Sequence, residues 1–440
     1  MSCLLVHTPL SLACRRPTIP LCAAARNPLG AVRPATSIGK TGGRLVILGS
    51  GWAGLKLLGG INTKDYEVLM IAPRNHFVFT PLLASTSVGT LEFRTITEPV
   101  RHHNRKALYH QAWCDSIDLT TRSLTCMPAL PDHTQPFTLS YDKLVIAVGA
   151  YSNTFGIPGV EQHGFFLKEI SHAQRVRARI IECFEMASEP NCSEDDQWKL
   201  LSFAVVGGGP TGVEFSAELH DFIKDDLRRL YPSLINKAQI TVYDVAEKIL
   251  GSFDDALADY ATQKFAREGI KIRTKTFIRK VEKNKLVLTD GTEIPFGVLV
   301  WATGLTATPL IRNLSPAAHS SSHRLVTDDY LRVLDLDGTP IPDVYACGDC
   351  ATIKGNELPA TAQVASQQGI WLRKHLNKVP RNEMGQPMAY IGGWKAIMET
   401  PNESKLPKGI RGYLAWLAWR SAYLYKSVSA RNMVLIPITW

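Results

Sequence analysis

Two stretches of the chain repeat one order of apolar, glycine-rich and amphipathic segments. Residues 45–48 read "LVIL" and residues 203–206 read "FAVV", and each apolar run leads into three closely spaced glycines and a helix-forming segment. A short, wholly apolar run bounded by turn residues predicts a buried strand of a parallel sheet. The repeated order therefore predicts an α/β fold class with two Rossmann-like dinucleotide-binding domains.

Six glycines form the two turns. They are Gly49, Gly51 and Gly54 in the first unit and Gly207, Gly209 and Gly212 in the second. In such a unit the first glycine makes the tight turn, the second lets the backbone approach a pyrophosphate, and the third lets the helix pack closely on the strand. The phosphates then face the N-terminus of the helix. Two complete units predict two bound nucleotides, with plain turns as the alternative.

A second apolar strand follows each unit and should end at an acidic residue that binds the adenosine ribose. In the second unit Asp244 ends the strand "AQITVYD", and no arginine follows it directly. We expect Asp244 to accept from both ribose hydroxyls and to favour NADH over NADPH; a solvated strand end is the alternative. In the first unit Ala72, Pro73 and Arg74 occupy this place. Either the backbone and Arg74 hold that ribose, or the first site is not an ordinary dinucleotide pocket.

Composition and charge narrow the class of protein. A chain of 440 residues, 45% of them hydrophobic, supports two or three domains. It has no apolar run of about 18 residues, which argues against ion pumping through transmembrane helices. Residues 1–41 contain five basic residues and no acid, which predicts an organelle-targeting presequence, with a basic tail of no purpose as the alternative. Without it the net charge falls to 9 − 5 = +4, too small a surplus to indicate nucleic-acid binding.

The nine cysteines are scattered and do not indicate a disulfide framework. Cys347 and Cys350 form a C-x-x-C pair, which could be a redox dithiol or half of a metal site. No second C-x-x-C or histidine pair completes a metal-binding set, so we expect no metal site. Their place within "YACGDC" favours a packing role.

Three further segments resemble the two-dinucleotide-binding flavoprotein superfamily. They are "LVIAVGA" (144–150), "VLVWATG" (298–304) and "DVYACGDCA" (343–351). The resemblance implies that FAD binds the first glycine unit and a nicotinamide nucleotide the second. It also implies that Gly348 and Asp349 contact the ribityl chain and pyrophosphate of FAD. Gly149, Thr303 and Gly304 match further cofactor-binding positions.

Within that superfamily the chain resembles the type II NADH:quinone oxidoreductases, which do not pump protons. The resemblance rests on residues 72–101, on "FFLKEISHAQRVRARI" (165–180) and on "LPATAQVASQQG" (358–369). It implies that NADH reduces FAD and that a membrane quinone accepts the electrons. Arg74 and Thr80 of the first segment match FAD-binding positions.

The A-Q-x-A-x-Q pattern of residues 362–367 matches the family's quinone-side helix. Ala362 would then lie beneath the flavin ring, and Gln363 and Gln367 would line the quinone pocket. An amide can donate to a quinone carbonyl and accept from a quinol hydroxyl without a change of charge. Two glutamines on an exposed helix face are the alternative. Glu214, in "GPTGVEF", matches a family glutamate near the nicotinamide, to which we assign positioning; an ordinary first-turn helix acid is its alternative.

The C-terminal segment has a different character. After Glu403 there are six basic residues and no acid, and Trp416, Trp419 and Tyr423 recur at helical spacing. Basic flanks with aromatic anchors predict a helix that lies on a membrane surface; a dimer or core-packing helix is the alternative. We therefore expect a peripheral protein of an organelle inner membrane, and the well-spread arginines of the presequence favour the mitochondrion over the plastid thylakoid. The resemblance to the family also implies a homodimer through the C-terminal region.

These assignments divide the chain into five parts. They are a presequence (1–41), the first part of an FAD domain (42–160), an NAD(H) domain (161–289), the second part of the FAD domain (290–385) and a membrane-associating region (386–440). An Asp-Gly turn at residues 290–291 predicts the hairpin where the chain returns to the FAD domain.

Several other functions remain open at this point. A soluble reductase of a protein electron carrier and a redox-sensing binding module both fit two nucleotide sites. A sulfide:quinone oxidoreductase would not need Asp244. A disulfide reductase would need a cysteine pair in "GWAGLKLLGG" (51–60), which has none.

Overall fold

The computed structural model describes residues 40–379 except residues 252 and 254. Its larger sheet has ten strands. In sheet order they are β22 (Ala351–Ile353), β19 (Leu325–Thr327), β20 (Arg332–Leu334), β21 (Pro340–Ala346), β8 (Lys143–Ile146), β1 (Arg44–Leu48), β2 (Glu67–Ala72), β5 (Leu108–Asp118), β6 (Ser123–Pro128) and β7 (Phe137–Ser140). From β21 to β5 each pair of neighbours is parallel, and β5, β6 and β7 form an antiparallel meander.

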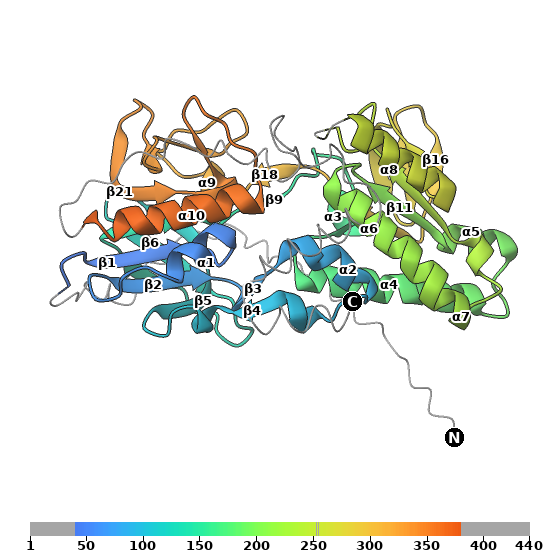
Figure 1. Ribbon diagram of the computed structural model, residues 1–440, viewed down its shortest axis with the longest axis horizontal. Coiled ribbons are helices and arrows are strands. Elements are labelled where there is room, and N and C mark those ends of the chain that lie inside the picture. The colour runs from blue at the N-terminus through green and yellow to red at the C-terminus, as the bar shows by residue number, and fades with distance from the viewer. Residues whose placement is uncertain (1–39, 252, 254, 380–440) are drawn as a thin grey trace, which may run out of the picture.

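Both faces of this sheet are covered, which is why β1 is buried throughout its length. Leu45 and Ile47 point to the face on which α1 (Trp52–Leu58) and α10 (Ala362–Leu376) pack. Val46 and Leu48 point to the other face, where they join a cluster that includes Ile311 of α9 (Pro309–Arg312). Helix α10 lies alongside α1 over the sheet in the left half of Figure 1.

The second sheet has five strands, all parallel, in the order β10-β17-β11-β12-β13. These are β10 (Phe165–Phe166), β17 (Val298–Trp301), β11 (Ser202–Val206), β12 (Gln239–Tyr243) and β13 (Lys271–Arg273), and the helices around them are α4 (Ile170–Ser188), α6 (Pro210–Asp221) and α8 (Asp255–Glu268). The sheet thus extends to Trp301, beyond residue 289, where we expected the NAD(H) domain to end. Strand β17 is buried throughout and pairs along its two edges with β11 and β10, and its sequence alone does not indicate these partners.

A small antiparallel sheet precedes β17. It consists of β14 (Ile278–Glu282), β15 (Lys285–Leu288) and β16 (Glu293–Pro295). Gly291 lies in the turn between β15 and β16 with φ +88°, a conformation that favours glycine. The hairpin that the Asp-Gly pair predicts is therefore confirmed, although both of its strands precede the last strand of the second domain.

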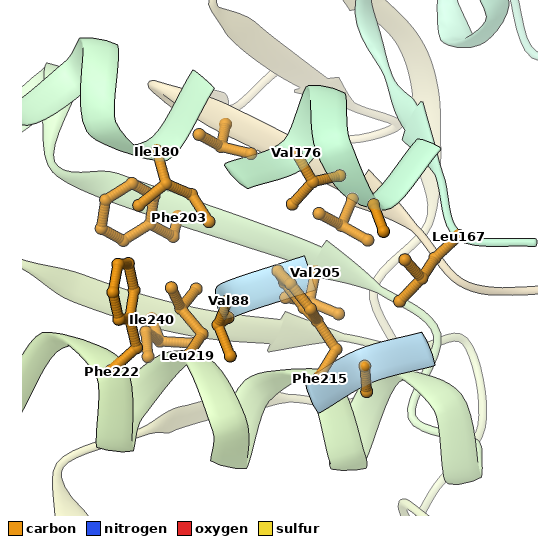
Figure 2. Close-up of a cluster of buried hydrophobic side chains, with 14 of the residues drawn as sticks. Val88, Leu167, Val176, Ile180, Phe203, Val205, Phe215, Leu219, Phe222 and Ile240 are labelled. Carbon is orange, nitrogen blue, oxygen red and sulfur yellow. The ribbon is translucent and has the colours of Figure 1, made fainter. Parts of the chain in front are cut away.

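One apolar cluster joins the two domains. Helix α2 (Leu83–Val88) belongs to the first domain in sequence, but its side chains pack against α4 and α6 of the second. Figure 2 shows Val88 among Phe215 and Leu219 of α6 and the β11 side chains. Each fully buried side chain of this size contributes about 1.5–3 kcal/mol. The packing of α2 therefore holds the second glycine unit in place relative to the first.

The remaining described elements are short. The strands are β3 (His76–Val78), β4 (Thr97–Pro99), β9 (Ala150–Ser152) and β18 (Leu305–Ala307); the helices are α3 (Val160–His163), α5 (Glu194–Leu200) and α7 (Arg228–Leu230); five 3-10 turns are η1 (Thr80–Leu82), η2 (Phe93–Ile96), η3 (Val100–His102), η5 (Ile235–Lys237) and η6 (Gly348–Cys350); and one π-helical segment is η4 (Phe222–Leu227).

The predicted fold class, α/β with two Rossmann-like domains, is confirmed. Across residues 40–379, no helix is both long enough and apolar enough to span a bilayer. The presequence, apart from its last two residues, and the C-terminal membrane-associating region lie outside the described residues.

Candidate functional site

The first glycine turn has the geometry that nucleotide binding requires. Gly49 has φ +103°, and a Cβ built on it would lie 2.3 Å from the carbonyl oxygen of Ala147. A Cβ on Gly54 would lie 2.0 Å from the carbonyl oxygen of Gly49, so the close contact of α1 with the turn depends on a glycine there. A Cβ on Gly51 would meet no atom within 4 Å. Gly51 therefore faces open space in front of the helix N-terminus, where a pyrophosphate would bind.

The second turn repeats this arrangement. Gly207 has φ +116°, and a Cβ on Gly212 would lie 1.9 Å from the carbonyl oxygen of Gly207. A Cβ on Gly209 would again meet no atom within 4 Å. Pro210 occupies the first position of α6, where its missing N–H costs no hydrogen bond. Two open glycines at two helix N-termini fit two dinucleotides.

Hydrogen bonds fix Asp244 beside the second turn. One carboxylate oxygen accepts from the backbone N–H of Gly208, and the other accepts from Ala246 at 2.7 Å. Each oxygen keeps a free lone pair, because a carboxylate oxygen can accept two hydrogen bonds. The half-buried carboxylate is thus oriented at the end of β12, where a ribose bound to this turn would lie.

Arg74 lies beside the first turn. Its carbonyl oxygen accepts from Tyr109 at 2.8 Å and from Ser50, in the glycine turn, at 3.3 Å. Its guanidinium lies 3.8 Å from the carboxylate of Glu169. Arg74 therefore lies at the end of β2, where a ribose-binding acid is expected. One N–H group of its guanidinium faces Glu169, and within the described part of the chain the other N–H groups are available to a ligand.

Thr80 is held by α1. The indole N–H of Trp52, the residue after Gly51, donates to the Thr80 hydroxyl at 3.1 Å. Segment 72–101 therefore returns to the first turn, and Thr80 lies next to the helix N-terminus.

The Gly-Asp turn at residues 348–349 lies over both α1 and α10. Gly348 has φ +77°, and a Cβ built on it would meet Ala365 at 3.5 Å and Ala53 at 3.7 Å. Its N–H donates to the buried side-chain oxygen of Gln368 at 2.7 Å. Gln368, which the sequence analysis did not single out, thereby joins the quinone-side helix to the turn expected to contact FAD.

A buried cation lies next to Asp349. The ammonium of Lys168 donates to the carbonyl oxygen of Ala150 at 2.7 Å. Burial lowers the pKa of Lys168, and the nearby Asp349 carboxylate counteracts this by favouring the charged form. Burial also raises the pKa of Asp349, and Lys168 and Arg324 oppose that rise. Lys168 follows the apolar run 165–167 and precedes Glu169, and no local pattern in the sequence assigns it a role.

Three further predicted positions, Gly149, Thr303 and Gly304, follow strands β8 and β17. Gly149 has φ +68° and faces open space next to Ala150. Gly304 has φ +72°, and the Thr303 side chain lies against the second glycine turn, 2.9 Å from a Cβ built on Gly207. The segment that follows β8 therefore lies at the first glycine turn, and the segment that follows β17 lies at the second.

Helix α10 begins at Ala362, the first residue of the A-Q-x-A-x-Q pattern. The Thr361 hydroxyl caps it by accepting from the N–H of Val364 at 3.3 Å. Gln363 and Gln367 follow one turn apart, and Ala362 is the first helical residue. The side-chain nitrogen of Gln363 is buried and has no hydrogen-bond partner within the described chain. A buried unpaired donor costs about 1–3 kcal/mol, so its presence here fits a ligand that accepts a hydrogen bond.

Glu214 lies in the second turn of α6, not in the first. Burial, and to a smaller extent the neighbouring Glu218, raises the pKa of Glu214 to about 7. Among the described residues no side chain or backbone group hydrogen-bonds to it. The position differs from that of an ordinary dipole-stabilising acid, which sits in the first turn and stays ionised.

The C-x-x-C cysteines are packing residues, as expected. Cys347 and Cys350 are fully buried and form no disulfide, and the Cys350 thiol donates to the carbonyl oxygens of Cys347 at 3.3 Å and Ile146 at 3.4 Å. Burial raises the pKa of both thiols, that of Cys350 to about 11. Both flank the Gly-Asp turn and support it from beneath. In the described part of the chain no cluster of metal-ligating side chains occurs.

Two nucleotide turns joined by the Gly-Asp turn and the marker glycines define a two-nucleotide flavoprotein oxidoreductase. The model of the pyridine nucleotide-disulphide oxidoreductase family matches residues 43–369, and that of the NDH2 C-terminal domain matches residues 387–440. The chain therefore belongs to the NDH2 family, the type II NADH dehydrogenases, within the pyridine nucleotide-disulphide oxidoreductases.

Known proteins agree with this membership. A probable NADH dehydrogenase of Dictyostelium discoideum is 40% identical, over 90% of this chain and 88% of that protein. The mitochondrial internal alternative NAD(P)H-ubiquinone oxidoreductase A1 of Solanum tuberosum is also 40% identical, over 90% of this chain and 85% of its own. The solved structure of NDH2 from Plasmodium falciparum in complex with NADH has a TM-score of 0.78 at 26% identity, covering 90% of this chain and 97% of that one. The chain is accordingly an FAD-dependent NADH dehydrogenase.

Proposed function

We propose that this protein transfers two electrons from NADH through FAD to a membrane quinone, on the mitochondrial inner membrane and without pumping protons. The observation that carries the proposal is the buried amide nitrogen of Gln363 at the start of α10, which has no hydrogen-bond partner among residues 40–379 as described. FAD supplies the redox chemistry by accepting a hydride from NADH and passing the electrons on. The chain supplies binding, orientation and the electrostatic surroundings.

The NADH side is formed by the second glycine turn. Gly209 admits the pyrophosphate, and Asp244 accepts from the ribose hydroxyls with its remaining lone pairs. A carboxylate there repels a 2′-phosphate, so NADH is the preferred donor. Glu214 follows on the same helix and orients the nicotinamide. With a pKa of about 7 it also holds a proton part of the time at neutral pH, and its protonated form can donate a hydrogen bond to the ligand.

The quinone side is formed by the first turns of α10. Gln363 and Gln367 share one face of the helix, and their amides can donate to the quinone or accept from the quinol. The N-terminus of α10 carries a partial positive charge, which favours negative charge on the pyrimidine side of FAD. Gln368 and Gly348 fix this end of the helix to the FAD-binding turn.

Membrane binding rests on residues 386–440, which resemble the C-terminal domain of NDH2 proteins. A basic, aromatic segment suits an interfacial helix, and several relatives are named as mitochondrial. Import into plastids is the alternative. A homodimer through this region would appear as a dimer by light scattering in detergent, and a monomer alone would exclude it.

The double substitution Gln363→Ala with Gln367→Ala tests the proposal. Loss of two ligand hydrogen bonds should slow reoxidation of FAD by a short-chain quinone about 10- to 100-fold. Reduction of FAD by NADH should change little, because neither side chain lies on the second glycine turn. Gln162→Ala, at an exposed position, is the matched control. An equal loss of both half-reactions in the double variant would contradict the assignment.

A further inference from the structure

Two cysteines face each other on neighbouring strands, away from the nucleotide turns. Cys114 on β5 and Cys126 on β6 are direct partners in the antiparallel register. Directly opposed residues of an antiparallel pair have Cα atoms about 4.5–5.5 Å apart. Disulfide-bonded cysteines have Cα separations of about 4.4–6.8 Å. The backbone is therefore already placed for a bond between the two sulfurs.

Their side chains lie on the same face of the two strands. Both belong to the apolar cluster beneath the larger sheet, with Cys126 fully buried and Cys114 at its margin, partly open to solvent. Both are free thiols in the structure. Because directly opposed residues of an antiparallel pair point to the same face, the two thiols face each other within this cluster. The neighbouring Cys126 thiol and burial raise the pKa of Cys114.

We propose that Cys114 and Cys126 are a redox modification site that closes to a cross-strand disulfide in the presence of hydrogen peroxide. The more accessible Cys114 sulfur attacks one peroxide oxygen, the O–O bond breaks, and a sulfenic acid and one water result. The Cys126 sulfur then displaces the second oxygen, which leaves as water as the S–S bond forms. The two thiols lose two electrons and two protons, and the peroxide gains both.

The two thiols stay reduced unless exposure to hydrogen peroxide is prolonged. The thiolate is the reactive form, and the raised pKa of Cys114 keeps that form scarce. The second step is fast by comparison, since the Cys126 thiol already lies directly opposite Cys114. This order of events protects Cys114 from further oxidation to the sulfinic acid.

The bond would reinforce the strand that supports the first nucleotide site. Tyr109 and Gln111, on the same strand β5, donate to the carbonyl oxygens of Arg74 and Pro73. The cysteines are 126 − 114 = 12 positions apart, so the disulfide closes a short loop of chain. Such a cross-link should raise the thermal midpoint of the FAD-loaded protein by about 2–5 °C.

Peptide mapping of the full-length holoprotein under non-reducing conditions, before and after treatment with excess hydrogen peroxide, tests the site. The expected result is a linked pair of peptides containing Cys114 and Cys126, which separates on addition of dithiothreitol and accompanies the rise in thermal midpoint. The proposal is overturned if Cys114 becomes sulfinic acid while Cys126 stays free, or if neither reacts while other thiols do.

Single variants separate the bond from general oxidation. Cys126→Ala should abolish both the linked peptides and the peroxide-dependent rise in thermal midpoint. In Cys114→Ser, where the outer sulfur is replaced and the buried one is kept, the same two signals should be absent. Cys192→Ser, a lone and partly exposed cysteine, is the control and should retain both signals. A peroxide-dependent rise that survives in either pair variant would contradict the assignment.

Discussion

Replacing Glu214 with glutamine should stabilise the protein in a pH-dependent way. The carboxyl is half-buried on α6 near a second acid, Glu218, and its pKa is raised from 4.5 to about 7. Glu218 itself is held by the hydroxyls of Ser85 at 2.8 Å and Thr90 at 2.9 Å, both from the first domain. Glutamine keeps the size of the side chain and removes its charge.

The size of the effect follows from the shift in pKa. A rise of about 2.5 pKa units corresponds to about 3 kcal/mol, and partial exposure of the side chain makes this an upper limit. Between pH 4.5 and about 7 the folded protein binds more protons at Glu214 than the unfolded chain. The contribution of Glu214 to the free energy of unfolding therefore falls as the pH rises through this window. Above the window, the destabilisation by the ionised carboxylate has reached its full size.

Urea unfolding of the FAD-loaded protein measures this effect. The variant should differ little from the wild type at about pH 5, and should be more stable by about 1–3 kcal/mol at about pH 8. Glu182→Gln, which removes an exposed carboxylate of the same domain, should show no such growth with pH. A Glu214→Gln variant whose stability difference is the same at both pH values would refute the raised pKa.

Three further predictions concern the nucleotide sites. Asp244→Asn should reduce the preference for NADH over NADPH in kcat/KM, and an unchanged ratio would remove Asp244 from the site. Gly209→Ala should keep the fold and raise the KM for NADH about 10-fold or more, because the added Cβ meets only the ligand. Gly212→Ala should instead impair folding, as circular dichroism would show, because its Cβ would lie 1.9 Å from a backbone oxygen. Lys168→Met should lower the midpoint potential of FAD by about 30 mV, by removing a nearby positive charge, whereas Lys168→Arg should not; equal potentials in a spectroelectrochemical titration would contradict that role.

The sequence allowed the local parts of the site to be predicted. Both glycine turns and Asp244 at its strand end depend on short-range rules of backbone conformation, which neighbouring residues express directly. The resemblance to a family then placed residues such as Gln363, whose chemistry the spacing alone left open.

The rest depends on contacts between distant segments. Lys168 and Gln368 act through groups 18 and 20 residues away in sequence, Ala150 and Gly348, which no local pattern reveals. Strand β17 looks like any buried strand, and only its pairing with β11 assigns it to the second sheet. The same holds for α2, whose apolar face is matched by a surface more than 100 residues later in the chain, on α6.

The most direct test of the central claim is anaerobic stopped-flow spectroscopy of the purified, FAD-loaded protein. NADH is first mixed with the protein while flavin absorbance is followed, and the reduced protein is then mixed with a short-chain quinone. We expect NADH to bleach the flavin absorbance quickly and the quinone to restore it quickly. Fast bleaching with recovery only by oxygen or a protein acceptor would contradict an NADH:quinone oxidoreductase.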